Sequence, residues 1–200
     1  MTEAFVLATA NPDKAREIAE IVGDDIELIP RPPEVPDVEE SGATLLDNAR
    51  LKAEALVSAT GRPALADDTG LEVDALGGAP GVRSARYAGE PSDPVANVAK
   101  LLAELVGKGS PDARRARFRT VAVAAWPGGA EVIAEGTVEG WIALEPAGRE
   151  GFGYDPVFVP DDGGGGTFAE MTALEKHALS HRGRAFRELA RQLRDARPGA

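Results

Sequence analysis

Short apolar runs that end at glycine, proline or asparagine are the feature of this sequence that most limits its fold. Expected strands are residues 4–9, 26–29 and 64–66, and expected helices are residues 12–22 and 45–58. Asn11 followed by Pro12 is typical of a helix start, and Gly23 is typical of a helix end. This alternation of strand and helix predicts an α/β fold.

The second half of the chain predicts a different arrangement. Its expected elements are a helix from residue 94, hairpin strands at 118–126 and 131–138, a strand at 157–159, and helices at 172–179 and 182–196. Added to the first half, they predict a mixed central β-sheet flanked by helices. We find no repeat and no long linker, so residues 1–200 are expected to form a single domain with two lobes, and the tail 197–200 to be disordered.

Composition excludes several classes of partner. The net charge is −11, which disfavours binding to nucleic acid or to an anionic membrane surface. No apolar run is long enough to span a bilayer, and the first residues lack the basic start of a secretory signal. The chain has no cysteine, so disulfides and thiolate sites are absent and a cytoplasmic location is expected.

The turn at residues 9–14 is the first candidate site. A strand ends there and a helix begins, and the N–H groups and positive dipole of a helix start can bind phosphate. Lys14, one turn into the helix, would add a positive charge. The alternative is that Asn11 only caps the helix and that Lys14 is solvated.

Carboxylates suggest a second candidate site. Asn48 and Lys52 are four residues apart on one expected helix face, which suggests that they share a ligand. Glu40 lies upstream of them and could belong to the same site, or it could only compensate the helix dipole. Asp67 and Asp68 follow a buried strand, where adjacent carboxylates need a cation or several donors. Oxygen ligands near phosphate indicate Mg²⁺. The alternative for the Asp pair is a simple Asx-turn.

Two further segments could recognise a nucleobase. Residues 151–156 place two aromatics and an acid among glycines, which could form a stacking platform or only cover the edge of a core. His181 and Arg182 open the last helix, where cations oppose the helix dipole, so we expect them to face an anion or an acceptor unless they are a surface accident. Lys176 lies just upstream.

Taken in order, these segments resemble the inosine triphosphate pyrophosphatase family, also called the Ham1-like family, in its bacterial branch. The matching positions are 9–14, 40, 44, 48–49, 52–53, 66–71, 77–81, 84–87, 151–156, 175–176 and 180–182. The resemblance implies Mg²⁺-dependent hydrolysis of dITP, ITP and XTP to the monophosphate and pyrophosphate, which keeps deaminated purines out of DNA and RNA. It also implies an elongated molecule with the active site in the cleft between its lobes, and a homodimer.

The resemblance assigns a role to individual residues. Asp68 would be the catalytic residue, and Glu40 and Asp68 would hold the metal. The substrate-binding residues would be Thr9, Ala10, Asn11, Pro12, Asp13, Lys14, Lys52, Thr69, Phe152, Gly153, Tyr154, Asp155, Lys176, His181 and Arg182.

Two rival functions stay open at this point. One is a pyrophosphatase for pyrimidine or methylated nucleotides, as in the related Maf-like family, against which the Phe152 loop and residues 180–182 argue. The other is a nucleotide sensor that binds without turnover, against which Glu40 and Asp68 argue.

Overall fold

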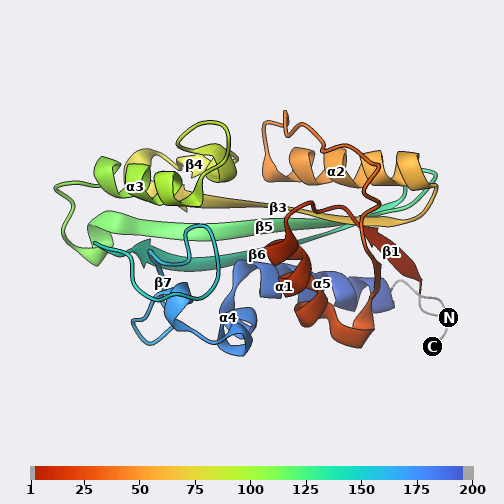
Figure 1. Cartoon of the computed structure of the whole chain (residues 1–200). Helices are drawn as coiled ribbons and strands as arrows, with labels where there is room; N and C mark the ends of the chain where they lie inside the picture. Colours follow the sequence, from red (N-terminus) through yellow and green to blue (C-terminus); the bar gives the residue numbers. More distant parts are fainter. Residues whose placement is uncertain (1–2, 196–200) are drawn as a thin grey trace. The chain divides into compact units, whose positions relative to one another are not determined.

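A mixed β-sheet organises the computed structural model, which describes residues 3–195 (Figure 1). Within these residues the sheet has seven strands in the order β2-β1-β3-β5-β6-β7, with β4 paired to β3. The strands are β1 Ala4–Leu7, β2 Glu27–Ile29, β3 Ala64–Val73, β4 Pro80–Gly81, β5 Arg115–Ala125, β6 Glu131–Ile142 and β7 Phe158–Pro160. The α-helices are α1 Pro12–Val22, α2 Leu45–Thr60, α3 Pro94–Glu104, α4 Ala173–Leu179 and α5 His181–Asp195. The predicted mixed α/β fold is confirmed.

The chain divides into two compact units. The first contains the described residues up to Asp68, together with Thr120–Gly136 and the described residues from Arg182 onward. The second contains Thr69–Arg119 and Thr137–His181. Residues 197–200, for which disorder was expected, lie outside the described part. Of the helices in residues 3–195, none combines the length and the apolar character that crossing a bilayer requires.

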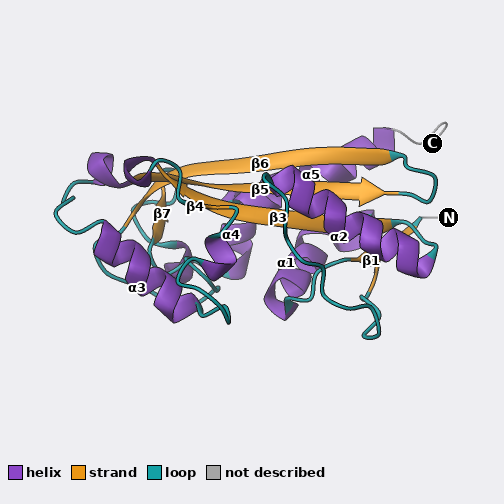
Figure 2. Cartoon of the chain, turned by 90° about the horizontal axis from the view of Figure 1, so that it is seen from above, coloured by secondary structure: helices purple, strands orange, loops and turns teal. Residues whose placement is uncertain are grey.

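The first unit is built on parallel strands. β1 pairs in parallel with β2 on one side and with β3 on the other. Within this unit, α2 covers one face of the sheet, and α1 and α5 cover the other (Figures 1 and 2). Its core joins β1, α1 and α5 through Phe5, Ile18 and Phe186. A ligand crevice is expected where helices leave a parallel sheet on opposite faces, at the carboxyl ends of the strands.

Local sequence signals explain how the two helices next to β1 begin. The side chain of Asn11 accepts hydrogen bonds from the first turn of α1, and Pro12 stands at its first position. Thr44 and Asp47 form a capping box at the start of α2, and Gly61 ends α2 in the left-handed region. α1 therefore starts and stops where the sequence predicts, and α2 starts where predicted but continues two residues beyond the expected end, to Thr60.

The second unit has its own core. Antiparallel pairs join β3 to β4 and β6 to β7. In Figure 1, α3 and α4 lie on opposite sides of its strands. The core packs aromatic rings together. The rings of Phe118 and Phe158 meet edge to face with their centres 4.8 Å apart, and the centres of the Phe158 and Phe168 rings are 5.2 Å apart.

One expected boundary is wrong. Residues 67–70 were expected to follow a short strand, with an Asx-turn as one alternative, but β3 continues from Ala64 to Val73. Buried apolar residues beyond the polar stretch, Leu71 and Val73, keep the strand in the sheet. Asp67 and Asp68 therefore point to opposite faces of a strand.

Arg114 is a buried cation that binds backbone carbonyls. Its guanidinium donates to the carbonyl oxygens of Leu105 and Lys108 after α3, and to those of Ile142 and Ala143 at the end of β6. We expect Arg114→Met to lower the free energy of unfolding by about 3 kcal/mol, because the carbonyls lose their buried donors. Urea denaturation measures this loss.

A neighbouring arginine supplies the control for this prediction. Arg115 pairs with Asp161 at 2.7 Å, and both side chains are at least one third exposed. Arg115→Met should therefore cost less than about 1 kcal/mol. Equal losses for Arg114→Met and Arg115→Met would contradict the role given to Arg114.

Candidate active site

The turn between β1 and α1 carries the first group of predicted residues. The side-chain oxygen of Asn11 accepts hydrogen bonds from the N–H groups of Asp13 at 2.9 Å and of Lys14 at 3.1 Å. Thr9 Oγ1 accepts the N–H of Asn11 at 3.1 Å. Asn11 is thus a helix cap, and the positive end of α1 still faces this turn.

The two aspartates of β3 have different partners. Asp67 is buried, with Lys14 Nζ 3.5 Å and Arg182 Nη2 3.6 Å from its Oδ2. Asp68 points the other way, toward α2, where Lys52 Nζ donates to its Oδ1 at 2.8 Å. The alternation along an extended strand explains why each carboxylate meets a different helix.

Asn48 and Lys52 share the buried face of α2, as the sequence predicts. Asn48 Nδ2 donates to Asp68 Oδ2 at 3.2 Å, and its Oδ1 accepts the N–H of Gly42 at 2.8 Å. A side chain at Gly42 would collide with Asn48, since an added Cβ would lie 2.6 Å from Oδ1. Lys52 Nζ also donates to Glu40 Oε1 at 3.0 Å, so Glu40 and Asp68 meet at one ammonium group.

Burial and charge shift the acid–base properties of this pair. The pKa of Asp68 is raised mainly because burial disfavours its charge; Lys52 opposes the shift. Burial also disfavours the charge on Lys52, but Asp68 and the other carboxylates outweigh it and raise the pKa of Lys52. The result is a carboxylate with raised basicity, held against a protonated lysine.

Glu17 is a residue that the sequence reasoning missed. It lies on α1, is buried, and its Oε2 accepts from Arg182 Nη1 at 2.6 Å. Glu17 and Asp67 supply the anions that the cation at the start of α5 was expected to face. The one local signal for a buried role was its position. Glu17 lies three residues after Lys14 and next to the apolar Ile18, on a helix face that packs on the core.

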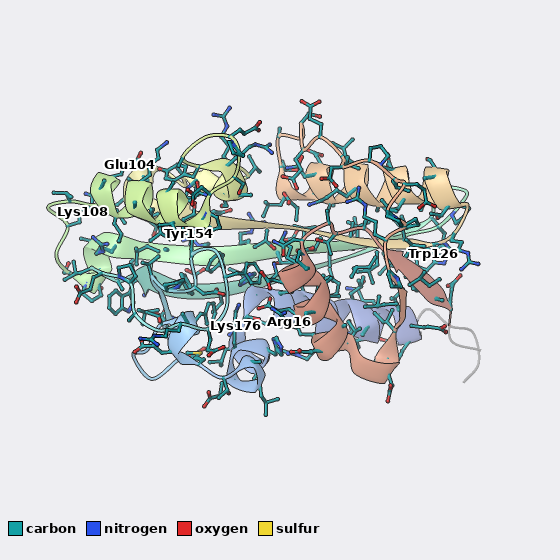
Figure 3. All side chains as sticks on the ribbon, viewed as in Figure 1. Arg16, Glu104, Lys108, Trp126, Tyr154 and Lys176 are labelled. Carbon is teal, nitrogen blue, oxygen red and sulfur yellow. The ribbon has the colours of Figure 1, made fainter. Side chains whose placement is uncertain are left out.

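The second unit brings together part of the predicted base-binding group. Lys176 lies on α4 (Figure 3). Its Nζ donates to Asp155 Oδ2 at 2.6 Å and lies 4.9 Å from the centre of the Phe152 ring. Asp155 also accepts the N–H of Phe152 at 2.7 Å. Only glycine fits at position 151. Its φ is +71°, and a Cβ there would lie 2.1 Å from Asp155 Oδ2 and collide with it.

Other predicted residues of this unit lie in its core. The ring of His181 stacks on Phe118 with their centres 4.5 Å apart. Tyr154 is buried, and its hydroxyl donates to the carbonyl oxygen of Ser84 at 2.9 Å. We therefore expect Tyr154 to support the loop rather than to contact a ligand through its side chain. Thr69 is half-buried on β3, next to Asp68.

The donor set around Lys52 fits a magnesium ion. Glu40 and Asp68 offer carboxylate oxygens to one cation, and Mg²⁺ prefers one or two carboxylates completed by water and substrate phosphates. In residues 3–195 no cluster of three or more His, Cys, Asp or Glu has the arrangement of a complete metal site. The residues fit an ion that a bound ligand helps to hold.

Fold and site together define a class of protein. It is a mixed α/β protein in which the positive end of a helix faces the turn after the first strand, near buried carboxylates. The chain belongs to the Ham1 family, whose model matches residues 5–192.

Relatives and a solved structure resemble the chain over almost its full length. It is 47% identical to a dITP/XTP pyrophosphatase of Streptomyces avermitilis, in an alignment that covers 96% of this chain and 97% of the relative. It is 45% identical to a dITP/XTP pyrophosphatase of Bacillus subtilis, with 96% and 98% covered. A HAM1 protein structure from Coxiella burnetii superimposes with a TM-score of 0.86 at 40% identity, covering 98% and 100%.

Proposed function

We propose that this protein hydrolyses the non-canonical purine nucleotides dITP, ITP and XTP to the monophosphate and pyrophosphate. The observation that carries the proposal is the buried Asp68, held by Lys52 and Asn48. It lies in a chain of the Ham1 family whose relatives at 45–47% identity are dITP/XTP pyrophosphatases. Removal of deaminated purines from the nucleotide pool would follow from this activity.

In this proposal the first unit binds the triphosphate. A triphosphate brings up to four negative charges to a protein of net charge −11, so local cations must offset the repulsion. Lys14, Lys52 and the positive end of α1 supply that charge. The proposed phosphate-binding residues are Thr9, Ala10, Asn11, Pro12, Asp13, Lys14 and Lys52.

Asp68 performs the acid–base step of the proposed mechanism. Its carboxylate orients the attacking water and accepts its proton, and the raised pKa makes it a better base than an ordinary aspartate. Asn48 and Lys52 fix its orientation. Glu40 and Asp68 would hold Mg²⁺, which when bound neutralises negative charge on the phosphates.

The second unit would recognise the base. Phe152 would stack on it, with the residues 153–155 beside it, and Lys176 and His181 would donate hydrogen bonds toward the 6-oxo group. Arg182, which follows His181 directly but belongs to the first unit, would donate to the same base edge. Adenine carries an amino donor at that position, so a pocket of donors rejects ATP; losing such a pairing discriminates by about 10⁴-fold or more. Thr69 would contact the same nucleotide.

One nucleotide is proposed to use both groups of residues. The chain passes from the first unit to the second between Asp68 and Thr69, and returns between His181 and Arg182. Each pair consists of consecutive residues, so at both crossings two residues that are proposed to serve the same nucleotide are covalent neighbours. A homodimer in the cytoplasm is also proposed, on the resemblance alone.

A substrate panel tests this function. Purified protein is assayed with Mg²⁺ against ITP, XTP, dITP, GTP, ATP and dUTP, and pyrophosphate is distinguished from orthophosphate. We expect pyrophosphate from the first three nucleotides and little from ATP and dUTP, with activity lost in a chelator; GTP, which shares the 6-oxo group, measures how far the pocket reads the rest of the base. Preference for dUTP would favour a pyrimidine nucleotide pyrophosphatase, and tight ITP binding without turnover would favour a sensor; either result contradicts the proposal.

Lys14 predicts how substrate capture depends on pH. Burial lowers its pKa below the ordinary 10.5, and the attraction of Asp67 does not offset this. Lys14 therefore loses its proton at a lower pH than an exposed lysine does. The site then has one positive charge fewer with which to bind the triphosphate. We expect kcat/KM for ITP to fall on the alkaline side with a pKa below 10.5.

The variant Lys14→Met checks the assignment of this pH dependence. It should raise KM by about tenfold or more and should abolish the alkaline decrease, because the ammonium group with the lowered pKa is removed. Steady-state kinetics over pH measure both effects. An unchanged alkaline limb in Lys14→Met would assign that limb to another group.

A further inference from the structure

The ammonium group of Lys52 stands between the two carboxylates that are proposed to hold a metal. Nζ lies 2.8 Å from Asp68 Oδ1 and 3.0 Å from Glu40 Oε1. The side chains of Lys52 and Asp68 are only 11% and 6% exposed, so water and salt screen this contact weakly. A positive charge thus already occupies the position where a divalent cation would meet both carboxylates.

The two other cations of this cluster contact different carboxylates. Lys14 Nζ lies 3.5 Å from Asp67, and Arg182 Nη1 lies 2.6 Å from Glu17. Lys52 therefore competes directly with a metal ion for the carboxylate pair. An ammonium and a divalent cation cannot both bind tightly between the same two oxygens, because they repel each other at such short range.

We propose that Lys52 keeps the Glu40–Asp68 pair closed to divalent cations in the free enzyme and opens it when nucleotide phosphates draw its ammonium away. The proposal rests on the proposed function, which supplies the triphosphate. Lysine carries its charge on a flexible four-carbon stem, and phosphate oxygens accept its hydrogen bonds as carboxylates do. The metal then enters with the nucleotide and not before it.

Metal titration without nucleotide tests this inference. Binding of Mn²⁺, a paramagnetic substitute for Mg²⁺, is measured at about pH 8 by the electron paramagnetic resonance of the free ion. The wild type should bind weakly, and Lys52→Gln should bind about tenfold tighter or more, because the carboxylate pair then lacks its competing ammonium. Arg50→Gln removes a positive charge from the same helix, but Arg50 pairs with Glu131 at 2.5 Å. This control should keep the wild-type affinity.

Three results would overturn the inference. The first is an equal or weaker Mn²⁺ affinity in folded Lys52→Gln. The second is a gain that persists when Asp68→Asn is added to Lys52→Gln, because the metal would then bind elsewhere. If Lys52→Gln is unfolded without metal, the Mn²⁺ concentration at half folding replaces the affinity, and a failure of Mn²⁺ to restore folding is the third.

The same preparations separate this inference from the proposed function. Wild-type protein that releases pyrophosphate from ITP while Lys52→Gln keeps the wild-type Mn²⁺ affinity overturns the role of Lys52 alone. Wild-type protein that leaves ITP intact overturns the proposed function, whatever the Mn²⁺ titration shows.

Discussion

Asp68→Asn should lower kcat for ITP by about two orders of magnitude or more, the largest loss that we expect from one conservative substitution. Asparagine keeps the shape of the side chain but cannot accept the proton of the attacking water. It also removes one of the two carboxylates that fit the metal. KM should change much less, because Lys14 and Lys52 still bind the phosphates. Steady-state kinetics with pyrophosphate detection measure this effect.

A surface aspartate provides the matched control. Asp161 pairs with the partly exposed Arg115, and Asp161→Asn makes the same chemical change outside the proposed site. Its activity should remain that of the wild type. Most of the wild-type activity in Asp68→Asn at saturating Mg²⁺ would show that the catalytic role belongs to another group.

The second large effect is expected from Arg182→Ala. The side chain of Arg182 is 2% exposed and contacts Glu17 and Asp67. Its removal leaves two buried carboxylates without that cation, which costs about 3–5 kcal/mol of the free energy of unfolding. Adding Glu17→Gln should restore part of the loss, because the double variant buries one charge fewer. Urea denaturation of the two variants measures this, and a loss below about 1 kcal/mol would contradict the role given to Arg182.

The same variant tests base recognition. If Arg182 also reads the base edge, as proposed, Arg182→Ala raises KM for ITP and narrows the preference for ITP over ATP. Comparison of kcat/KM for the two nucleotides gives the result. An unchanged preference would restrict Arg182 to organising Glu17 and Asp67.

The parts of the fold that follow local rules could be predicted from the sequence. Pro12 and Gly23 mark the ends of α1, and the capping box at Thr44 marks the start of α2. These signals act within one turn of helix, so they can be recognised without tertiary contacts. The length of β3 could not be predicted, because two acidic residues in mid-strand depend on cations from α1 and α2.

The candidate site shows the same limit. Residue types and order indicate Glu40, Asn48, Lys52 and Asp68, and the structure brings all four together. Glu17 was missed because its partner, Arg182, is 165 positions away, and no local pattern encodes that pairing. Tyr154 lies in the core, where its hydroxyl donates to the carbonyl oxygen of Ser84, and the sequence of the loop contains no signal of that contact.

A structure of Asp68→Asn with Mg²⁺ and ITP tests the central claim most directly, because the variant binds the nucleotide without consuming it. The account predicts phosphate oxygens within hydrogen-bond distance of Lys14 and Lys52, and the hypoxanthine ring stacked on Phe152. A nucleotide bound with its phosphates away from the start of α1, or with its base away from Phe152, would contradict it.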